Sequence, residues 1–174
     1  EALLFAAAGV FIAVTYPLFK RFTHLPQVYL GIAFSWGIPM AFSAQTGTVQ
    51  PVAWALLFAN LLWTVAYDTM YAMADRPDDI KIGVKSSAIL LGRYDRLVNT
   101  ILQLLALAIL AVIGYRLDLN SWYYLGLVGA AATTAYQNRL CRNRDRALCL
   151  KAFINNTWFG ASVFAGIVLS FATA

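Results

Sequence analysis

The chain has 174 residues, of which 61% are hydrophobic and only 12% are charged, and its formal net charge at pH 7 is +5. Soluble domains carry about 25% charged residues, so this composition excludes an ordinary soluble globular domain. The apolar residues form continuous stretches near the roughly 20 residues that a helix needs to cross a bilayer. Because these stretches do not alternate with polar residues, we predict an all-α, polytopic transmembrane helix bundle rather than a barrel of strands.

We expect residues 1–174 to form a single transmembrane domain with six spans. Gly37 and Pro39 lie within the second span and predict a kink there. The connections are short, except for a polar stretch at 74–96 and a basic stretch at 138–151. In chain order, the predicted spans cover about 2–19, 27–45, 51–73, 97–115, 121–137 and 153–172.

The positive charges predict how the spans are oriented. Twelve of the 13 Lys and Arg residues follow the first, third or fifth span, and Arg116 is the exception. If the spans alternate in direction, these three connections share one side, which the positive-inside rule assigns to the cytoplasm. The polar stretch 74–96 is therefore expected on the cytoplasmic side, and the basic cluster Arg139–Arg146 is interpreted as an anchor for anionic lipid. This asymmetry explains the net charge without nucleic-acid binding.

The third span leads into a run of acidic residues. Five of the eight Asp and Glu residues lie between positions 68 and 95. Asp68 falls at the end of the apolar span, where a carboxylate is costly and is usually functional. On a helix, Asp68, Tyr71 and Asp75 share one face, and Asp79 follows Asp75 by four residues. Pro77 predicts that this helix ends near Asp75 and restarts.

Carboxylates at the end of a helix bundle favour magnesium. This ion takes one or two protein carboxylates and completes its shell with water and substrate phosphates. It would neutralise a diphosphate as a leaving group. We therefore predict Asp75 and Asp79 as metal ligands, with Lys81, Lys85 and Arg21 close enough to hold phosphate oxygens. The alternative is a solvated loop of mixed charge, because a DxxxD spacing alone is weakly specific.

Three blocks of sequence carry a family resemblance. They are YPLFKRFTHLPQ at 16–27, GIAFSWGIPMA at 31–41, and the stretch that begins at Asp68. In order and spacing they resemble the UbiA superfamily of intramembrane prenyltransferases, in the branch that acts on 4-hydroxybenzoate. The resemblance implies nine helices around a central cavity, with two aspartate-rich motifs that bind Mg2+ and the diphosphate of a polyprenyl donor.

The resemblance also implies a function. It implies an enzyme, an aromatic polyprenyltransferase, that transfers a polyprenyl group from polyprenyl diphosphate to a ring carbon of 4-hydroxybenzoate in ubiquinone biosynthesis. The enzyme is expected to lie in the bacterial inner membrane, surrounded by membrane lipid, with no nucleic-acid partner. The family's second aspartate motif matches Asp68, Tyr71, Asp75 and Asp79.

The first aspartate motif of the family, of NDxxDxxxD type, has no match, since the chain contains no Asn-Asp pair. This chain has six predicted spans and the family has nine, which implies that the chain corresponds to the last two-thirds of the enzyme. We therefore expect an N-terminally truncated chain that is inactive and poorly folded by itself.

The candidate site residues fall into a catalytic and a substrate-binding group. The predicted catalytic residues are Asp68, Asp75, Asp79 and Arg21, and the predicted substrate-binding residues are Lys20, Tyr71, Lys81, Lys85 and Asn60. For three of them another role explains the sequence equally well: Lys20 and Arg21 as anchors at the membrane interface, and Asn60 as a hydrogen-bonding residue between helices.

Other functions remain open on the sequence. Within the superfamily, the alternatives are the haem, menaquinone, chlorophyll and tocopherol pathways. Outside it, an ion-coupled transporter could use Asp68 as an intramembrane ion site, and a structural subunit would leave the aspartates without a use. Magnesium-dependent binding of a diphosphate distinguishes the enzyme from the transporter.

Overall fold

The computed structural model describes residues 2–19 and 23–173, and the described residues form helices and their connections without a strand. The predicted all-α bundle is therefore confirmed. The elements are α1 (Ala2–Phe19), α2 (Pro26–Ser35), α3 (Gly37–Thr46), α4 (Pro51–Ile82), α5 (Ser87–Leu91), α6 (Asp95–Arg116), α7 (Ser121–Leu140) and α8 (Arg146–Ala172), with 3-10 turns η1 (Gly92–Tyr94) and η2 (Cys141–Asn143).

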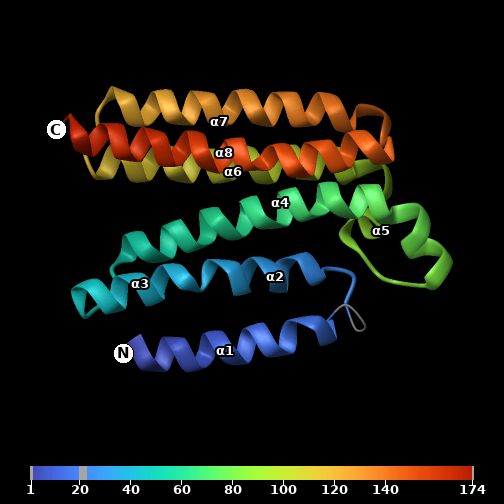
Figure 1. Ribbon diagram of the computed structural model, residues 1–174, viewed down its shortest axis with the longest axis horizontal. Helices are drawn as coiled ribbons and strands as arrows, with labels where there is room; N and C mark the ends of the chain where they lie inside the picture. The colour runs from blue at the N-terminus through green and yellow to red at the C-terminus, as the bar shows by residue number, and fades with distance from the viewer. Residues whose placement is uncertain (1, 20–22, 174) are drawn as a thin grey trace.

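The long helices run side by side along the length of the molecule (Figure 1). α4 lies in the middle, with α6, α7 and α8 on one side of it and α2, α3 and then α1 on the other. The core between α6, α7 and α8 is built around Leu107, Tyr123 and Phe159, which are buried. α1 contributes no buried residue and packs only at the edge of the bundle.

Four helical stretches among the described residues are long and apolar enough to span a membrane: Ala2–Phe19, Pro51–Ile82, Ser87–Arg116 and Arg146–Ala172. The predicted second span is divided into α2 and α3, which have ten residues each. This break lies beside Gly37 and Pro39, where the kink was predicted, because a proline has no N–H to continue the helical ladder. The number of six spans stays a prediction.

α4 extends further than predicted. It runs through Pro77 to Ile82, so the prediction that it ends near Asp75 is wrong, and residues 74–82 belong to a helix. A proline inside a helix removes one hydrogen bond, but α4 continues beyond it and ends only at Gly83. Gly83 adopts a φ of 72°, and its N–H bonds to the carbonyl of Asp79, as left-handed glycine caps commonly do.

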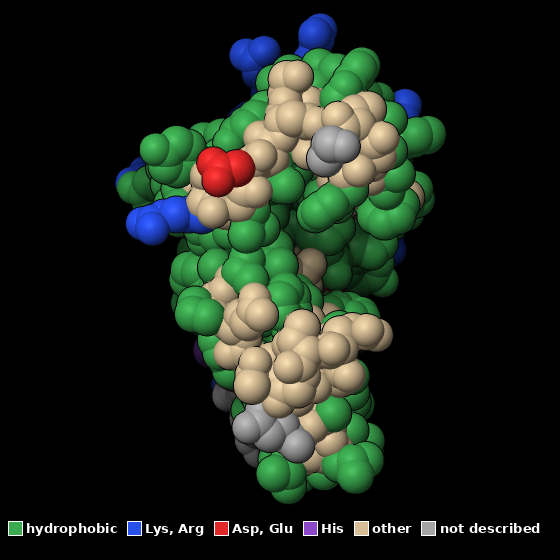
Figure 2. Space-filling model, turned by 90° about the vertical axis from the view of Figure 1, so that its left-hand side faces the viewer, with side chains coloured by type: hydrophobic (Ala, Val, Ile, Leu, Met, Phe, Trp, Pro, Cys, Tyr) green, Lys and Arg blue, Asp and Glu red, His purple; other side chains and the backbone are tan. Residues whose placement is uncertain are grey.

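Two ends of the bundle differ in charge. We call the end where α2 begins and α4 and α7 end the aspartate-rich end; it lies at the right of Figure 1. The described Lys and Arg residues lie at this end, except Arg116 at the end of α6. Figure 2 views the opposite end, whose surface is mostly hydrophobic or uncharged. This segregation matches the asymmetry expected from the sequence.

A buried ion network ties the helices together at the aspartate-rich end. Asp95, in the first turn of α6, has a fully buried side chain. Its carboxylate accepts hydrogen bonds from Arg144 at 2.7 and 2.8 Å, and Arg76 of α4 lies 3.7 Å away. The N–H of Arg96 donates to the same carboxylate at 2.6 Å. Asp95 therefore connects α4, α6 and the turn between α7 and α8.

Two glycines allow α7 and α8 to approach closely. A Cβ added to Gly126 would lie 2.6 Å from the carbonyl oxygen of Ser162 and 2.8 Å from the Cα of Gly166. Small residues commonly permit such contacts between membrane helices. We expect Gly126→Ala to destabilise the bundle by about 1–3 kcal/mol, because backbone atoms must move apart. The free energy of unfolding, measured in detergent or bilayers, tests this.

Gly37→Ala provides the matched control, because a Cβ at Gly37 meets no atom of residues 2–19 and 23–173 within 4 Å. We expect it to be neutral or to stabilise α3 by up to about 1 kcal/mol through helix propensity. Equal losses of stability in both variants would contradict the proposed close contact.

Candidate active site

The acidic face of α4 lines a small cavity at the aspartate-rich end. Asp68, Tyr71, Asp75 and Asp79 recur every three or four residues and therefore share one face of the helix. The start of α2 and the chain that follows α4 close around this face. The resulting cavity has a volume of about 80 Å³. We call it the aspartate pocket; its lining comprises Pro26, Gln27, Asp68, Tyr71, Ala72, Asp75, Asp79, Val84, Lys85 and Ser86.

Some predicted site residues lie elsewhere. Lys81 points away from the aspartate pocket, and its ammonium donates to Asp78 at 3.2 Å on the exposed side of α4. Asn60 lies deeper in the bundle, where its amide donates to the hydroxyl of Ser35 at 2.9 Å. Its interhelical role is therefore observed. Lys20 and Arg21 lie outside the described residues.

Arg146 of α8 connects the acidic end of α4 to the rest of the bundle. Its guanidinium donates to Asp78 at 2.6 Å and lies 3.8 Å from Asp75. Lys81 donates to the same carboxylate at 3.2 Å, so Asp78 has two cationic partners. Asp78 thus pairs with cations outside the aspartate pocket, while Asp75 faces it. The lipid-anchor interpretation of the basic cluster missed this ion pair.

The aspartate pocket contains polar atoms that find no partner among the described residues. Gln27 and Ser86 are buried, and within residues 2–19 and 23–173 the side-chain oxygens Oε1 of Gln27 and Oγ of Ser86 make no hydrogen bond. Buried polar atoms normally find a partner, because an unsatisfied one costs about 1–3 kcal/mol. Both residues border the pocket, so a polar ligand there would satisfy them. Sequence reasoning missed both.

The donor set fits a metal bound together with a phosphate ligand. Among the described residues, no group of three or more His, Cys, Asp and Glu side chains could hold a metal ion alone. Magnesium does not need such a cage, since it binds through one or two carboxylates plus water and substrate phosphate. Asp75, Asp79 and Lys85 meet this requirement, because they place carboxylates and an ammonium around one cavity.

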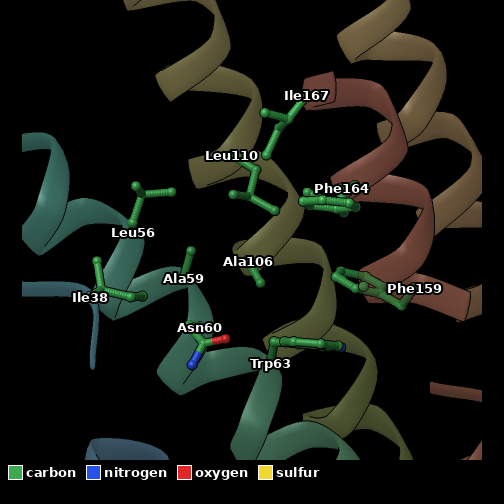
Figure 3. Close-up of a pocket in the computed structure, with 12 residues that line it drawn as sticks. Ile38, Leu56, Ala59, Asn60, Trp63, Ala106, Leu110, Phe159, Phe164 and Ile167 are labelled. Atoms are coloured by element: carbon green, nitrogen blue, oxygen red, sulfur yellow. The ribbon is translucent and has the colours of Figure 1, made fainter. Parts of the chain in front are cut away.

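An apolar cavity lies deeper in the bundle, between α3, α4, α6 and α8 (Figure 3). Its volume is about 210 Å³. The side chains of Leu110, Phe159 and Phe164 point into it, and Asn60 and Trp63 form its lower edge in the view of Figure 3. The indole N–H of Trp63 donates to Asn156 at 2.8 Å, which fixes the ring. This cavity can accept an apolar chain.

A row of aromatic rings connects the two cavities. Trp63 borders the apolar cavity and packs edge-on against Tyr67, with ring centroids 5.5 Å apart. Phe153 of α8 lies 6.0 Å from Tyr67 and 5.2 Å from Tyr71, and Tyr71 borders the aspartate pocket. We call these four residues the aromatic row. The aromatic row therefore lies between the aspartate pocket and the apolar cavity.

The comparisons with known proteins agree with this arrangement. The sequence pattern of the UbiA prenyltransferase family matches residues 1–171. A 4-hydroxybenzoate octaprenyltransferase of Methylococcus capsulatus is 57% identical over 91% of this chain, and one of Aeromonas salmonicida is 54% identical over 98%. The chain spans 54% and 58% of the length of these two relatives.

A solved structure has the same fold. The apo structure of a UbiA homolog from Aeropyrum pernix K1 superposes with a TM-score of 0.80, covering 97% of this chain and 64% of that protein at 22% sequence identity. At this identity the likeness concerns the fold alone. It confirms the prediction of an intramembrane helix bundle of this type.

Proposed function

The chain belongs to the UbiA prenyltransferase family, and from this premise we propose that it forms part of an enzyme that transfers a polyprenyl group from polyprenyl diphosphate to 4-hydroxybenzoate. One observation carries the proposal. The aspartate pocket, which suits a charged diphosphate, is joined by the aromatic row to an apolar cavity, which suits an isoprenoid tail. The relatives named for this reaction support the choice of acceptor.

The aspartate pocket is proposed to hold the diphosphate. Asp75 and Asp79 would bind Mg2+, which when bound neutralises the diphosphate and makes it a better leaving group. Lys85 borders the same cavity and is placed to bind phosphate oxygens directly. The hydroxyl of Ser86, which has no hydrogen-bond partner among the residues that the structure describes, supplies a further donor.

The aromatic row is proposed to stabilise the allylic cation that forms when the carbon–oxygen bond breaks. Ring faces attract cations, and the effect increases where water is excluded. Tyr67 and Phe153 lie between the two cavities, next to where the first isoprene unit would extend from the diphosphate. The apolar surroundings also keep water from capturing the cation.

Asp68 is proposed to orient the acceptor. It lies nearest to the membrane interior among the pocket's three aspartates, one turn of α4 before Tyr71. A carboxylate there can accept a hydrogen bond from the phenol of 4-hydroxybenzoate, which increases the electron density of the ring. The ring carbon ortho to the hydroxyl then attacks the cation, and the ring proton passes to the released diphosphate.

As a multi-pass membrane protein of this family, the chain is proposed to lie in the bacterial inner membrane with its aspartate-rich end in the cytoplasm. The charge difference between the two ends supports this orientation. The proposed product is an intermediate of ubiquinone biosynthesis. Since the chain spans only 54–58% of the two relatives, the proposed activity is that of a protein of their length, and we expect the 174 residues alone to be inactive.

The test uses membranes that contain the protein at the full length of its relatives, with polyprenyl diphosphate, Mg2+ and labelled 4-hydroxybenzoate. Prenylated 4-hydroxybenzoate is the expected product. A product formed only with a menaquinone-, tocopherol- or haem-pathway acceptor would move the protein to a sister branch. Absence of product with every acceptor, together with ion transport that depends on Asp68, would contradict the proposal that the protein is an enzyme.

Removal of divalent metal is expected to abolish the reaction. Without the cation, the pocket's aspartates would repel the diphosphate that they are proposed to bind. We expect EDTA to lower turnover to background and excess Mg2+ to restore it, as measured by product formation in the same membranes. Full turnover after thorough chelation would rule out the metal site.

A further inference from the structure

A second polar cavity at the aspartate-rich end lies between α6 and α7, and the function proposed above does not use it. It has a volume of about 290 Å³ and shares no lining residue with the aspartate pocket. We propose that it binds the phosphate of an anionic phospholipid. We call it the arginine pocket; its lining comprises Arg93, Arg96, Leu97, Thr100, Asn138 and Arg144.

The charge around the arginine pocket is strongly positive. Three of its six lining residues are arginines, and Arg76 lies close by through its contact with Asp95. Asp95 pairs with Arg144 and Arg76. Within the described part of the chain, Arg93 and Arg96 have no carboxylate in ion-pairing distance. Arg93 instead contacts the ring and hydroxyl of Tyr94. The pocket therefore retains an excess of positive charge that an anion would balance.

Two buried donors in the wall of this pocket lack an acceptor in the described part of the chain. They are Nε of Arg96 and Nδ2 of Asn138. The other nitrogens of Arg96 donate to the backbone carbonyls of Asn138 and Arg142 at 3.3 and 3.4 Å, which holds the guanidinium in the groove between the helices. Leaving donors of this kind unpaired is unfavourable. Phosphate oxygens are the acceptors that arginines commonly bind.

An apolar surface continues from the pocket along α6. Leu97 borders the pocket and is exposed, and Ile101 and Leu104 are exposed at the next positions on the same side of the helix. A free phosphate makes no use of this surface. A phospholipid does, because its acyl chains would lie along α6 while its phosphate occupies the pocket. Basic pockets between membrane helices bind anionic head groups in this way.

The location of the pocket gives the lipid a structural role. Arg144 borders the pocket, pairs with buried Asp95 and also donates to the carbonyl of Arg93 at 2.9 Å. A bound phosphate would therefore hold together the start of α6 and the turn between α7 and α8. We expect an anionic phospholipid to raise the thermal stability of the folded protein, because it binds the folded state alone.

The experiment measures binding and thermal stability of the detergent-purified protein, at the full length of its relatives, with three probes. They are phosphatidylglycerol, phosphatidylcholine and inorganic phosphate. We expect phosphatidylglycerol to bind and to raise the melting temperature, whereas phosphatidylcholine and millimolar inorganic phosphate have little effect. Equal stabilisation by phosphatidylcholine would overturn the proposal, because the site would then show no preference for a net negative charge. Equal stabilisation by inorganic phosphate would also overturn it, because the site would then not need acyl chains.

A pair of double variants tests the position of the site. Arg93→Gln/Arg96→Gln removes two charges from the arginine pocket and is expected to weaken phosphatidylglycerol binding about tenfold or more, the loss of roughly one charged hydrogen bond. Arg139→Gln/Arg142→Gln removes the same charge from side chains that do not line the pocket and is expected to keep wild-type affinity. An equal loss in both would indicate unspecific attraction and overturn the proposal. If the first variant fails to fold, Arg93→Gln alone, at an exposed position, gives the same comparison.

Discussion

Asp75→Ala is expected to lower prenyl transfer about 100-fold or more, which corresponds to roughly 2.7 kcal/mol in activation free energy. The carboxylate of Asp75 borders the aspartate pocket together with Asp79 and Lys85. Its removal would take away one of the two proposed Mg2+ ligands and leave the diphosphate charge poorly neutralised. The measurement is turnover of labelled 4-hydroxybenzoate in membranes that contain the protein at the full length of its relatives.

Asp78→Ala is the matched control for this prediction. It removes the same charge only three residues away, but Asp78 pairs with Lys81 and Arg146 outside the aspartate pocket. We expect turnover within about threefold of the wild type, since Arg146 keeps its contact with Asp75. Equal losses in both variants would mean that the acidic end of α4 acts through its total charge, and the assignment of the pocket would then fail.

Asp95→Ala is expected to destabilise the fold by about 3 kcal/mol. Removing one partner of a buried ion pair leaves the other charge uncompensated and costs about 3–5 kcal/mol. We expect the lower end of this range, because the side chains of Arg144 and Arg76 are 34% and 32% exposed and remain partly hydrated. The free energy of unfolding in detergent or bilayers is the measurement.

Asp145→Ala controls for the loss of an aspartate at the same end of the bundle. Asp145 is exposed and caps α8, where its carboxylate accepts a hydrogen bond from the N–H of Leu148 at 3.0 Å. Loss of such a cap costs about 1 kcal/mol. If Asp95→Ala proved no more harmful than Asp145→Ala, the buried network would contribute little to stability.

The acidic face of α4 was predictable from the sequence because it depends on local periodicity alone. Asp68, Tyr71, Asp75 and Asp79 follow helical spacing, and the structure places all four in one cavity. Lys85 also lines this cavity, because it follows α4 closely along the chain. The break beside Gly37 was predicted for the same reason: local backbone chemistry determines it.

Other parts of the site depend on contacts between distant segments. Gln27 reaches the aspartate pocket only because α2 packs against α4, and Arg146 reaches Asp78 across 68 positions of sequence. Asp95 and Arg144 are 49 positions apart. No periodic pattern links such residues. Pro77 shows the opposite error, since the local rule predicted a helix end that α4 does not have.

Equilibrium binding of a non-reactive polyprenyl diphosphate analogue to the purified protein shows whether the aspartate pocket binds a diphosphate together with Mg2+. We expect binding that requires Mg2+, falls at least about tenfold in Asp75→Asn/Asp79→Asn, and is retained in Asp78→Asn. Binding that is unchanged by chelation of Mg2+ and by loss of both pocket aspartates would contradict this expectation.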